Sequence, residues 1–361
     1  MKQFLFYYRK TFKNIVTSEP LVATLILSIF FYGIFYPTAY NAQQPEGLPI
    51  VIVDEEHSVT TEHIINNIYS NPDVHIVNIS GNFAEAKEMI QEEKAQGILL
   101  LPDGLSNSLR RGEPGGIGFY LSASNLLTTK KIGEGLALSV ENTLAEQFAK
   151  FSHITQFKPA VPIHQIPLYN TLSGYGSYVF PAISSLIVHQ TILLGLGMLV
   201  AGYREKMWKA TPTEFGAIFA ALLTIGCCGC LYFFGFVFWL FDYPHGGNFW
   251  GMLLGVPIFV SSVIALALLV ASYMDCAERI GHIIVASSVP LFLLSGIAWP
   301  YEAMPIWIQW IGQVLPSSVG PQMFIQLNQM GVPTSLVIPK MIYLICFTFF
   351  CSAIAYKRLK K

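Results

Sequence analysis

The sequence predicts a polytopic α-helical membrane protein with six transmembrane helices and a small extracytoplasmic α/β domain inserted between the first and the second. Three observations support this fold class. Of the 361 residues, 53% are hydrophobic and only 12% are charged, whereas an ordinary globular domain carries about 25% charged residues. Six stretches with almost no charge have the length of a helix that crosses a bilayer, about 20 residues. Residues 41–177 contain no such stretch and alternate between strand and helix patterns.

The six predicted spans are residues 21–40, 178–202, 215–241, 249–274, 283–299 and 337–356. The first follows a basic segment and is itself too long for the apolar part of a cleaved signal peptide, so we expect it to be retained. In the second span, Gly195 and Gly197 permit close contact with another helix. The composition excludes a cytosolic protein, a disordered chain and a nucleic-acid-binding protein with a basic face.

Lysine and arginine residues predict the orientation, because cytoplasmic loops carry an excess of them. They lie before the first span, between the second and third, between the fourth and fifth, and after the sixth, at Lys2, Arg9, Lys10, Lys13, Arg204, Lys206, Lys209, Arg279, Lys357, Arg358, Lys360 and Lys361. Both termini are therefore predicted to be cytoplasmic. Residues 41–177 hold 15 acidic and 8 basic side chains, and the remainder holds 7 and 13. The chain thus combines an acidic outer domain with a basic inner face.

The outer segment is predicted to form a small α/β domain. Its pattern predicts strands at 48–53, 74–79, 97–101 and 116–121, with helices near 58–69, 83–94, 102–110 and 128–153. Such alternation is typical of an α/β domain. His57, His63 and His75 admit two interpretations, a metal site or ordinary surface positions. Their spacing matches no zinc pattern, so neither a metal nor a cofactor is expected.

The first 20 residues are predicted to form a cytoplasmic amphipathic helix. Within residues 2–16, one face carries the apolar side chains and the opposite face the basic ones; the apolar set is Phe4, Leu5, Tyr8, Phe12, Ile15 and Val16, and the basic set is Lys2, Arg9, Lys10 and Lys13. Such a helix lies flat in a membrane interface beside anionic lipid. The alternative is a basic flank that only sets the topology.

The loop between the second and third spans carries both charges and a helix-capping pattern. It runs Arg204-Glu205-Lys206-Met207-Trp208-Lys209-Ala210-Thr211-Pro212-Thr213-Glu214. Thr211 can cap a helix that has Pro212 at its first position and Glu214 at its third. A capped helix entry on the cytoplasmic face could receive force from a partner, or the segment could be an ordinary short connection.

Three polar residues in and near the spans are candidates for a path through the membrane. His189 and Gln190 form the most polar point of any predicted span, and either pack against another helix or line a path. Glu302 follows the fifth span and either sits at the headgroup boundary or acts in a pore. The apolar residues near 303–330 predict re-entrant or interfacial short helices within the five-helix transmembrane domain of residues 178–361.

The motifs of common enzymes do not occur in the sequence. It has no phosphate-binding P-loop, no G-x-S-x-G, no H-E-x-x-H and no dinucleotide fingerprint. The chain is therefore not expected to be an enzyme, and no residue is proposed to be catalytic.

Four stretches give the chain a family resemblance over essentially its whole length. They are Ile50-Val-Ile-Val-Asp54-Glu-Glu-His-Ser58; Ala95-Gln-Gly97-Ile-Leu-Leu-Leu-Pro102 through Leu109-Arg-Arg-Gly112; Tyr178-Val-Phe-Pro181; and Leu294-Ser-Gly296-Ile-Ala-Trp-Pro300-Tyr-Glu302-Ala-Met-Pro305 with Leu315-Pro316. With these four stretches in this order, the chain resembles the permease subunits of type-2 ABC exporters. The resemblance is to the bacterial multidrug-export-like branch, whose members have a large extracytoplasmic domain.

The resemblance implies a subunit of the bacterial inner membrane that forms a pore with a second copy or a sister permease. A separate cytoplasmic ATPase subunit would drive it, and a periplasmic adaptor is a further expected partner beside membrane lipid. The amphipathic helix is similar to the family's connecting helix, through Phe4, Tyr8, Arg9, Phe12 and Lys13. The inner loop is similar to its ATPase coupling loop, through Arg204, Glu205, Lys206, Trp208, Thr211, Pro212 and Glu214. This loop is several residues shorter than is usual in the family.

The expected function is ATP-driven export of a hydrophobic or amphipathic substrate from the cytoplasm or the inner leaflet. His189, Gln190 and Glu302 are the expected substrate-path residues. The alternative is a membrane-anchored extracytoplasmic binding or assembly protein without transport activity. The five closely spaced C-terminal spans disfavour that alternative, since one span suffices for an anchor. A membrane enzyme acting on lipid would need a catalytic group that the sequence does not display.

Overall fold

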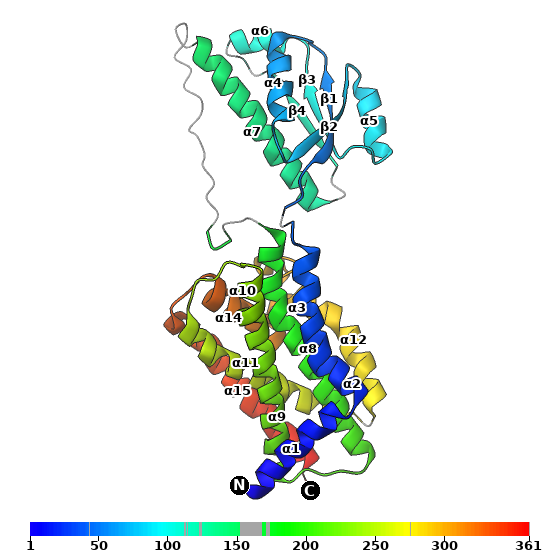
Figure 1. Ribbon diagram of the computed structural model, residues 1–361, viewed down its shortest axis with the longest axis vertical. Helices are drawn as coiled ribbons and strands as arrows, with labels where there is room; N and C mark the ends of the chain where they lie inside the picture. The colour runs from blue at the N-terminus through cyan, green and yellow to red at the C-terminus, as the bar shows by residue number, and fades with distance from the viewer. Residues whose placement is uncertain are drawn as a thin grey trace. The chain divides into compact units, whose positions relative to one another are not determined.

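The computed structural model describes residues 1–42, 44–111, 113, 115–122, 125–151, 168–170, 174–274 and 276–360. The chain divides into two compact units. One comprises Met1–Gln43 with Ile166–Lys361, and the other comprises Gln44–Gln165. The first unit is helical and the second contains a sheet with helices on both faces (Figure 1).

Within the described residues, six helices are long and apolar enough to cross a membrane. The first consists of α2 (Glu19–Val22), the π-helical turn η1 (Ala23–Leu27) and α3 (Ser28–Ala39). The second is α8 (Tyr175–Glu205), and the third consists of α9 (Pro212–Leu231), η2 (Tyr232–Val237) and α10 (Phe238–Leu240). The fourth, fifth and sixth are α11 (Phe249–Ala271), α12 (Ala277–Leu294) and α15 (Thr334–Leu359).

The predicted bounds of the fifth span are wrong by several residues at both ends. A span was expected at 283–299, whereas α12 begins at Ala277 and ends at Leu294. The charged residues Glu278 and Arg279 lie in the first turn of this helix, so a search for uncharged runs begins too late. At the other end, Gly296 has a φ of +80° and ends the helix before Trp299.

The helix α8 occupies the middle of the membrane unit. Most of its side chains are buried, and it packs against α3, α11, α12 and α14 (Pro316–Phe324). A Cβ atom added at Gly195 would lie 2.4 Å from Leu25 Cγ, and one at Gly197 would lie 2.8 Å from Ile280 Cγ2. The predicted close helix contacts at these glycines are therefore confirmed.

The segment between α12 and α15 folds into short helices. They are the 3₁₀ turn η3 (Tyr301–Ala303), α13 (Ile306–Val314), α14, and the π-helical turn η4 (Ile325–Gln329). α14 is almost wholly buried, and its Ser318 hydroxyl donates to the carbonyl of Leu294 at 2.9 Å. α13 instead exposes Trp307 and Trp310, the residue type that is enriched at membrane interfaces.

The second unit is a four-stranded sheet with the order β2-β1-β3-β4. Its strands are β1 (Leu48–Asp54), β2 (Val74–Ser80), β3 (Gly97–Leu101) and β4 (Gly118–Leu121), and only β4 is antiparallel to its neighbour. Its helices are α4 (Val59–Tyr69), α5 (Phe83–Gln91), α6 (Leu105–Arg110) and α7 (Leu126–Phe151). The predicted element types agree; residues 152 and 153 of the predicted last helix lie outside the described residues.

Helices cover both faces of this sheet (Figure 1). On one face α4 and α7 bury Ile64, Ile68 and Ile132 against β1 and β3. On the other face α5 buries Ala86 against Val51 and Val53. Because both faces of β1 are covered, its sequence is continuously apolar rather than alternating.

A buried carboxylate fixes the chain where β1 ends. Asp54 accepts hydrogen bonds from the amides of Glu56 at 3.2 Å and His57 at 3.0 Å, and from the Thr61 hydroxyl at 2.9 Å. Ser58 then caps α4 by accepting from the Thr61 amide. The buried Asp54 side chain therefore holds together the strand end, the turn and the first turn of α4.

Replacing Asp54 with Ala should destabilise the sheet unit by about 1–3 kcal/mol, because the buried Thr61 hydroxyl and two part-buried amides lose their acceptor. In hydrogen exchange of the full chain, amides of β1 and β3 should then exchange about 5 to 150 times faster. Asp103→Ala is the control, since Asp103 is exposed. Equal exchange in the two variants would show that the Asp54 carboxylate does not stabilise the strand end.

Candidate functional site

The predicted amphipathic helix forms, and it packs against the membrane unit. α1 (Lys2–Val16) buries Thr11 and Ile15, and its Tyr8 and Phe12 pack against the main core. The Tyr8 hydroxyl hydrogen-bonds the Thr224 hydroxyl of α9 at 3.0 Å, and Asn14 donates to the Tyr203 hydroxyl of α8 at 2.7 Å. α1 is thus joined to the second and third spans.

The packed face of α1 is narrower than the predicted apolar face. Leu5 and Val16 were expected to share that face, but they are 46% and 63% exposed. Both residues lie at the edge of the packed face. A helix that packs on one side only leaves the side chains at that edge exposed. Phe4 also remains partly exposed, and Arg9, Lys10 and Lys13 are exposed.

The connection from α8 to α9 is a short turn with the predicted cap. Thr211 accepts from the Glu214 amide while Glu214 accepts from the Thr211 amide, and Pro212 is the first helical residue. The capping box predicted for Thr211 and Glu214 is confirmed. The ring of Trp208 packs on Tyr203 with centroids 5.2 Å apart. Met207 has a φ of +58° and is 87% exposed, so it forms the tip of the turn.

Arg204 and Glu205, at the end of α8, hold the neighbouring pair of helices. The Arg204 guanidinium donates to the carbonyls of Ala271, Ser272 and Met274 at 3.1, 2.7 and 2.5 Å, at the end of α11. Glu205 accepts from the Ala277 amide, the first of α12, at 2.9 Å. A cation at the end of one helix and a carboxylate at the start of the next are each favourable with the helix dipoles. Lys206 is exposed.

The last residues of the chain also contact this turn. The amide of the buried Ala210 donates to the carbonyl of Leu359 at 2.7 Å, and Ala210 pairs with Lys360 in a short parallel bridge. The guanidinium of Arg358 lies 3.8 Å from the ring centroid of Tyr273, just beyond α11. The end of the sixth span is therefore tied to the same cluster of helix ends as Arg204.

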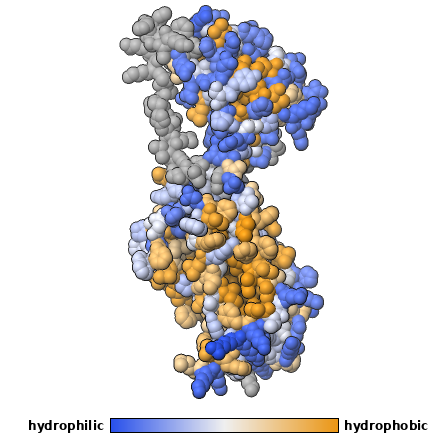
Figure 2. Space-filling model, in the orientation of Figure 1, coloured by the Kyte–Doolittle hydropathy of each residue, from blue (hydrophilic) through white to orange (hydrophobic). Residues whose placement is uncertain are grey.

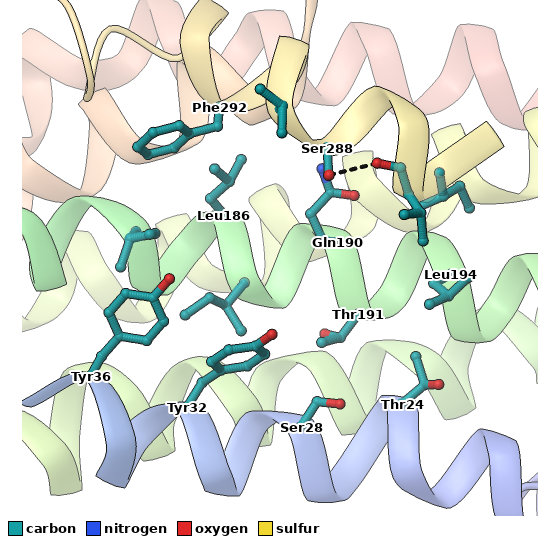
Figure 3. Close-up of a pocket in the computed structure, with 15 residues that line it drawn as sticks. Thr24, Ser28, Tyr32, Tyr36, Leu186, Gln190, Thr191, Leu194, Ser288 and Phe292 are labelled. Atoms are coloured by element: carbon teal, nitrogen blue, oxygen red, sulfur yellow. Dashed lines mark hydrogen bonds between the residues drawn. The ribbon is translucent and has the colours of Figure 1, made fainter. Parts of the chain in front are cut away.

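A hollow of about 460 Å³ lies between the first, second and fifth spans. Figure 3 shows that Tyr32, Gln190 and Ser288 reach it from three different helices. Its walls mix apolar and hydroxyl-bearing side chains: Thr24, Ser28, Tyr32, Tyr36, Ile183, Leu186, Ile187, Gln190, Thr191, Leu194, Ile284, Val285, Ser288, Val289 and Phe292. It falls within the usual size range of small-molecule sites, about 300–1,000 Å³.

Most hydroxyls around the hollow offer acceptors rather than donors. Thr24, Ser28 and Ser288 each donate their hydroxyl hydrogen to a carbonyl of their own helix, at 2.8, 2.7 and 2.7 Å. Their oxygen lone pairs remain available to a ligand. The amide of Gln190 can both donate and accept. The hollow is therefore suited to an apolar molecule that also carries hydrogen-bond donors.

The structure separates the three predicted path residues. Gln190 lines the hollow. The residue before it, His189, is fully buried and is not among the residues that line the hollow. Neither ring nitrogen of His189 and neither polar atom of the Gln190 side chain has a hydrogen-bond partner within the described residues. An unpaired buried polar group costs about 1–3 kcal/mol. A ligand or another arrangement of the helices would relieve that cost.

Glu302 does not join this site. It is exposed in η3, beyond the end of α12, and is not among the residues that line the hollow. Burial raises the pKa of the neighbouring Tyr301. Glu302 is close to the fifth span in the sequence, but it follows the residue at which α12 ends, so it lies outside that helix.

Sequence reasoning missed the polar strip of the first span. Thr24, Ser28, Tyr32 and Tyr36 are spaced by four residues, which puts them on one face of a helix. That spacing was a usable signal, although hydroxyls are too weakly polar to stand out in a hydropathy profile. In the part of the chain that the structure describes, no three His, Cys, Asp or Glu side chains group as metal ligands would.

A family model and two curated relatives match most of the chain. A family model described as "ABC-2 family transporter protein" matches residues 21–357. The chain is 22% identical over 334 residues to "Probable multidrug ABC transporter permease YbhR" of Escherichia coli (strain K12), with 85% of each chain covered. It is 22% identical over 343 residues to "Linearmycin resistance permease protein LnrN" of Bacillus subtilis (strain 168), with 84% of this chain and 82% of that one covered.

Among solved structures, the chain is similar to "a domain of a putative ABC type-2 transporter" from Thermotoga maritima MSB8. The identity is 28%, the match covers 30% of this chain and 73% of that one, and the TM-score is 0.24.

Arg204→Gln should loosen the junction of α11 and α12, because three carbonyls lose a charged donor and each such bond contributes about 1.5–3 kcal/mol. Hydrogen exchange of residues 269–280 should accelerate at least tenfold in the detergent-solubilised full chain. Lys206→Gln, which removes the same charge from an exposed neighbour, should leave exchange unchanged. Unaltered exchange in Arg204→Gln would mean that these bonds do not hold the junction.

Proposed function

Because the chain belongs to the ABC-2 family of transporter proteins, we propose that it is the permease subunit of an ATP-driven exporter. Family membership makes it a multi-pass membrane protein and the membrane subunit of an ABC transporter. The hollow between α3, α8 and α12 is the observation that carries the proposal. Its unpaired Gln190 side chain lies where a substrate would meet three spans at once.

The walls of the hollow support a hydrophobic or amphipathic substrate. Leu186, Val289 and Phe292 offer apolar contact, while the hydroxyl oxygens and Gln190 offer hydrogen bonds. A substrate with an apolar body and a few donors would use both. Two relatives are named for multidrug transport and linearmycin resistance, which supports movement out of the cell. The family membership argues against the alternative of a membrane anchor for a binding domain.

The proposed orientation places both termini in the cytoplasm and residues 41–177, with the α/β unit inserted between the first and second spans, outside. The distribution of lysine and arginine supports this arrangement in the inner membrane of a bacterium. A periplasmic adaptor would then bind the outer α/β unit. A second permease copy or a sister permease would close the hollow on its open side, where α12 exposes Val285 and Val289.

The coupling to the ATPase is proposed to run through the turn between α8 and α9. Met207 presents an apolar side chain at its tip, beside the exposed Lys206 and Lys209, and methionine is enriched in protein interfaces. Trp208 and the capped Thr211-Pro212-Glu214 segment hold the turn. α1 is the proposed connecting helix, with Tyr8 and Phe12 packed inward and Phe4, Arg9 and Lys13 outward.

Arg204 and Glu205 are proposed as positioning residues for this coupling. They join the end of α8 to the junction of α11 and α12, and both α8 and α12 line the hollow. A displacement of the turn by the ATPase would therefore move two walls of the hollow together. The end of the sixth span would follow through the Ala210–Leu359 hydrogen bond.

Purification from native membranes in mild detergent, with mass spectrometry of the co-purifying chains, tests the proposal. A P-loop ATPase is expected in near-stoichiometric amount.

Met207→Glu should lower the recovery of this ATPase at least tenfold, because a charge replaces an apolar side chain in the proposed contact. A tenfold loss corresponds to about 1.4 kcal/mol of binding free energy. Met304→Glu, outside this turn, is the control. Full recovery with Met207→Glu would rule out the turn as the docking point, and absence of any ATPase would contradict the proposed function.

Filling the hollow should block transport without releasing the ATPase. Ser288→Phe places a ring in the hollow, and we expect substrate-stimulated ATP hydrolysis in proteoliposomes to fall at least tenfold. Ser287→Phe is the matched control: Ser287 makes the same kind of bond to its own helix but does not line the hollow. Equal stimulation of the two variants would show that the substrate passes elsewhere.

A further inference from the structure

A groove lies elsewhere on the membrane unit, separate from the hollow between the first, second and fifth spans. Its volume is about 290 Å³, and it runs between α1, the first span and the third span. Phe12, Leu25, Ile29, Thr224, Cys228 and Tyr232 line it, and it shares no lining residue with the hollow. From Thr224 to Tyr232 the third span rises about 12 Å, at 1.5 Å per residue.

The polar groups in this groove already have partners. The Thr224 hydroxyl bonds Tyr8 and donates to the Ala220 carbonyl, both at 3.0 Å. The Tyr232 hydroxyl donates to the Phe30 carbonyl at 3.2 Å. The groove therefore offers an occupant apolar contact and little hydrogen bonding. Because its walls belong to membrane-spanning helices, the molecules that reach it are lipid chains.

On α1, the cation Arg9 lies one helical turn from Phe12, the residue of this helix that lines the groove. Leu5, Arg9, Phe12 and Val16 are spaced by four, three and four residues, so they form one strip along α1. Phe12 lines the groove, while the other three side chains of the strip are exposed, as is the adjacent Lys13. Within the described residues, no ion pair involves Arg9 or Lys13. Figure 2 shows hydrophilic surface at the level of α1, next to the apolar surface of the spans.

Lys10 lies on the other side of α1. It lines a small crevice with Tyr7, Trp208 and Glu214, and its ammonium group lies 6.0 Å from the ring centroid of Tyr7. Lys10 therefore carries the same charge on the same helix without bordering the groove. This asymmetry provides a matched control for the charges at Arg9 and Lys13.

We propose that the groove binds one anionic phospholipid. An acyl chain would lie between the first and third spans against Phe12, and the phosphate would pair with Arg9 and Lys13 at the membrane boundary. An anionic headgroup fits because a basic strip at a bilayer surface attracts negative charge. The lipid would fill the space that α1 leaves beside the two spans. This inference needs only that the helices span a membrane, and does not depend on transport or on an ATPase.

The full-length protein in detergent, titrated with phosphatidylglycerol, tests the site by native mass spectrometry. Phosphatidylcholine with the same acyl chains is the zwitterionic comparison. The Arg9→Gln, Lys13→Gln double variant should weaken phosphatidylglycerol binding about 25-fold, since each basic residue contributes about 1 kcal/mol, or about fivefold. Lys10→Gln should bind like the unaltered protein.

The groove itself is tested by Cys228→Phe, which adds a ring at an exposed lining position. We expect it to lower the binding of both lipids at least fivefold; Cys228→Leu, a smaller change, serves if the Phe variant does not fold. Unchanged phosphatidylglycerol binding in the double charge variant would overturn the headgroup assignment. Unchanged binding in both Cys228 variants would overturn the groove, leaving only attraction between a charged helix and a charged surface. No ATPase or substrate is present, so failure here would leave the proposed function untouched.

Discussion

The burial of α8 through the middle of the membrane unit is the constraint on which the other elements depend. At 31 residues it is about 46 Å long, whereas the hydrocarbon core of a bilayer is about 30 Å thick. One continuous helix can therefore carry Gln190 among the spans and Arg204 beyond them. Gly195 and Gly197 allow the first and fifth spans to approach it closely. This single helix therefore extends from the hollow at Gln190 to the junction at Arg204.

The sequence predicted features that arise from neighbouring residues and missed those that arise from distant ones. Spans were found from uncharged runs, and the cap of α9 from Thr211, Pro212 and Glu214, because each depends only on local pattern. The partners of Arg204 lie 67–70 residues away, and no local pattern identifies them. The start of α12 was missed because Glu278 and Arg279 interrupt the apolar run. Polarity alone suggested His189, Gln190 and Glu302 as candidate path residues, and of these three it is Gln190 that lines the hollow.

Polar residues inside the spans fall into two groups that differ in whether their side chains have hydrogen-bond partners. Thr24, Ser28 and Ser288 satisfy their hydroxyl hydrogens within their own helices, so they cost little when no ligand is present. His189 and Gln190 are buried without partners in the described part of the chain. A protein interior keeps such groups at a cost, so a rearrangement that gave them partners would release free energy at this stretch of α8.

The hydrogen bond between Ala210 and Leu359 has a consequence for biogenesis. These residues lie 149 positions apart in the sequence, so Leu359 is synthesised long after Ala210. The turn between α8 and α9 therefore cannot complete this contact until α15 has been made. In a chain whose α15 is not inserted, the backbone of Ala210 would lack this partner. Folding of the turn is thus coupled to insertion of α15, although the two are distant in the sequence.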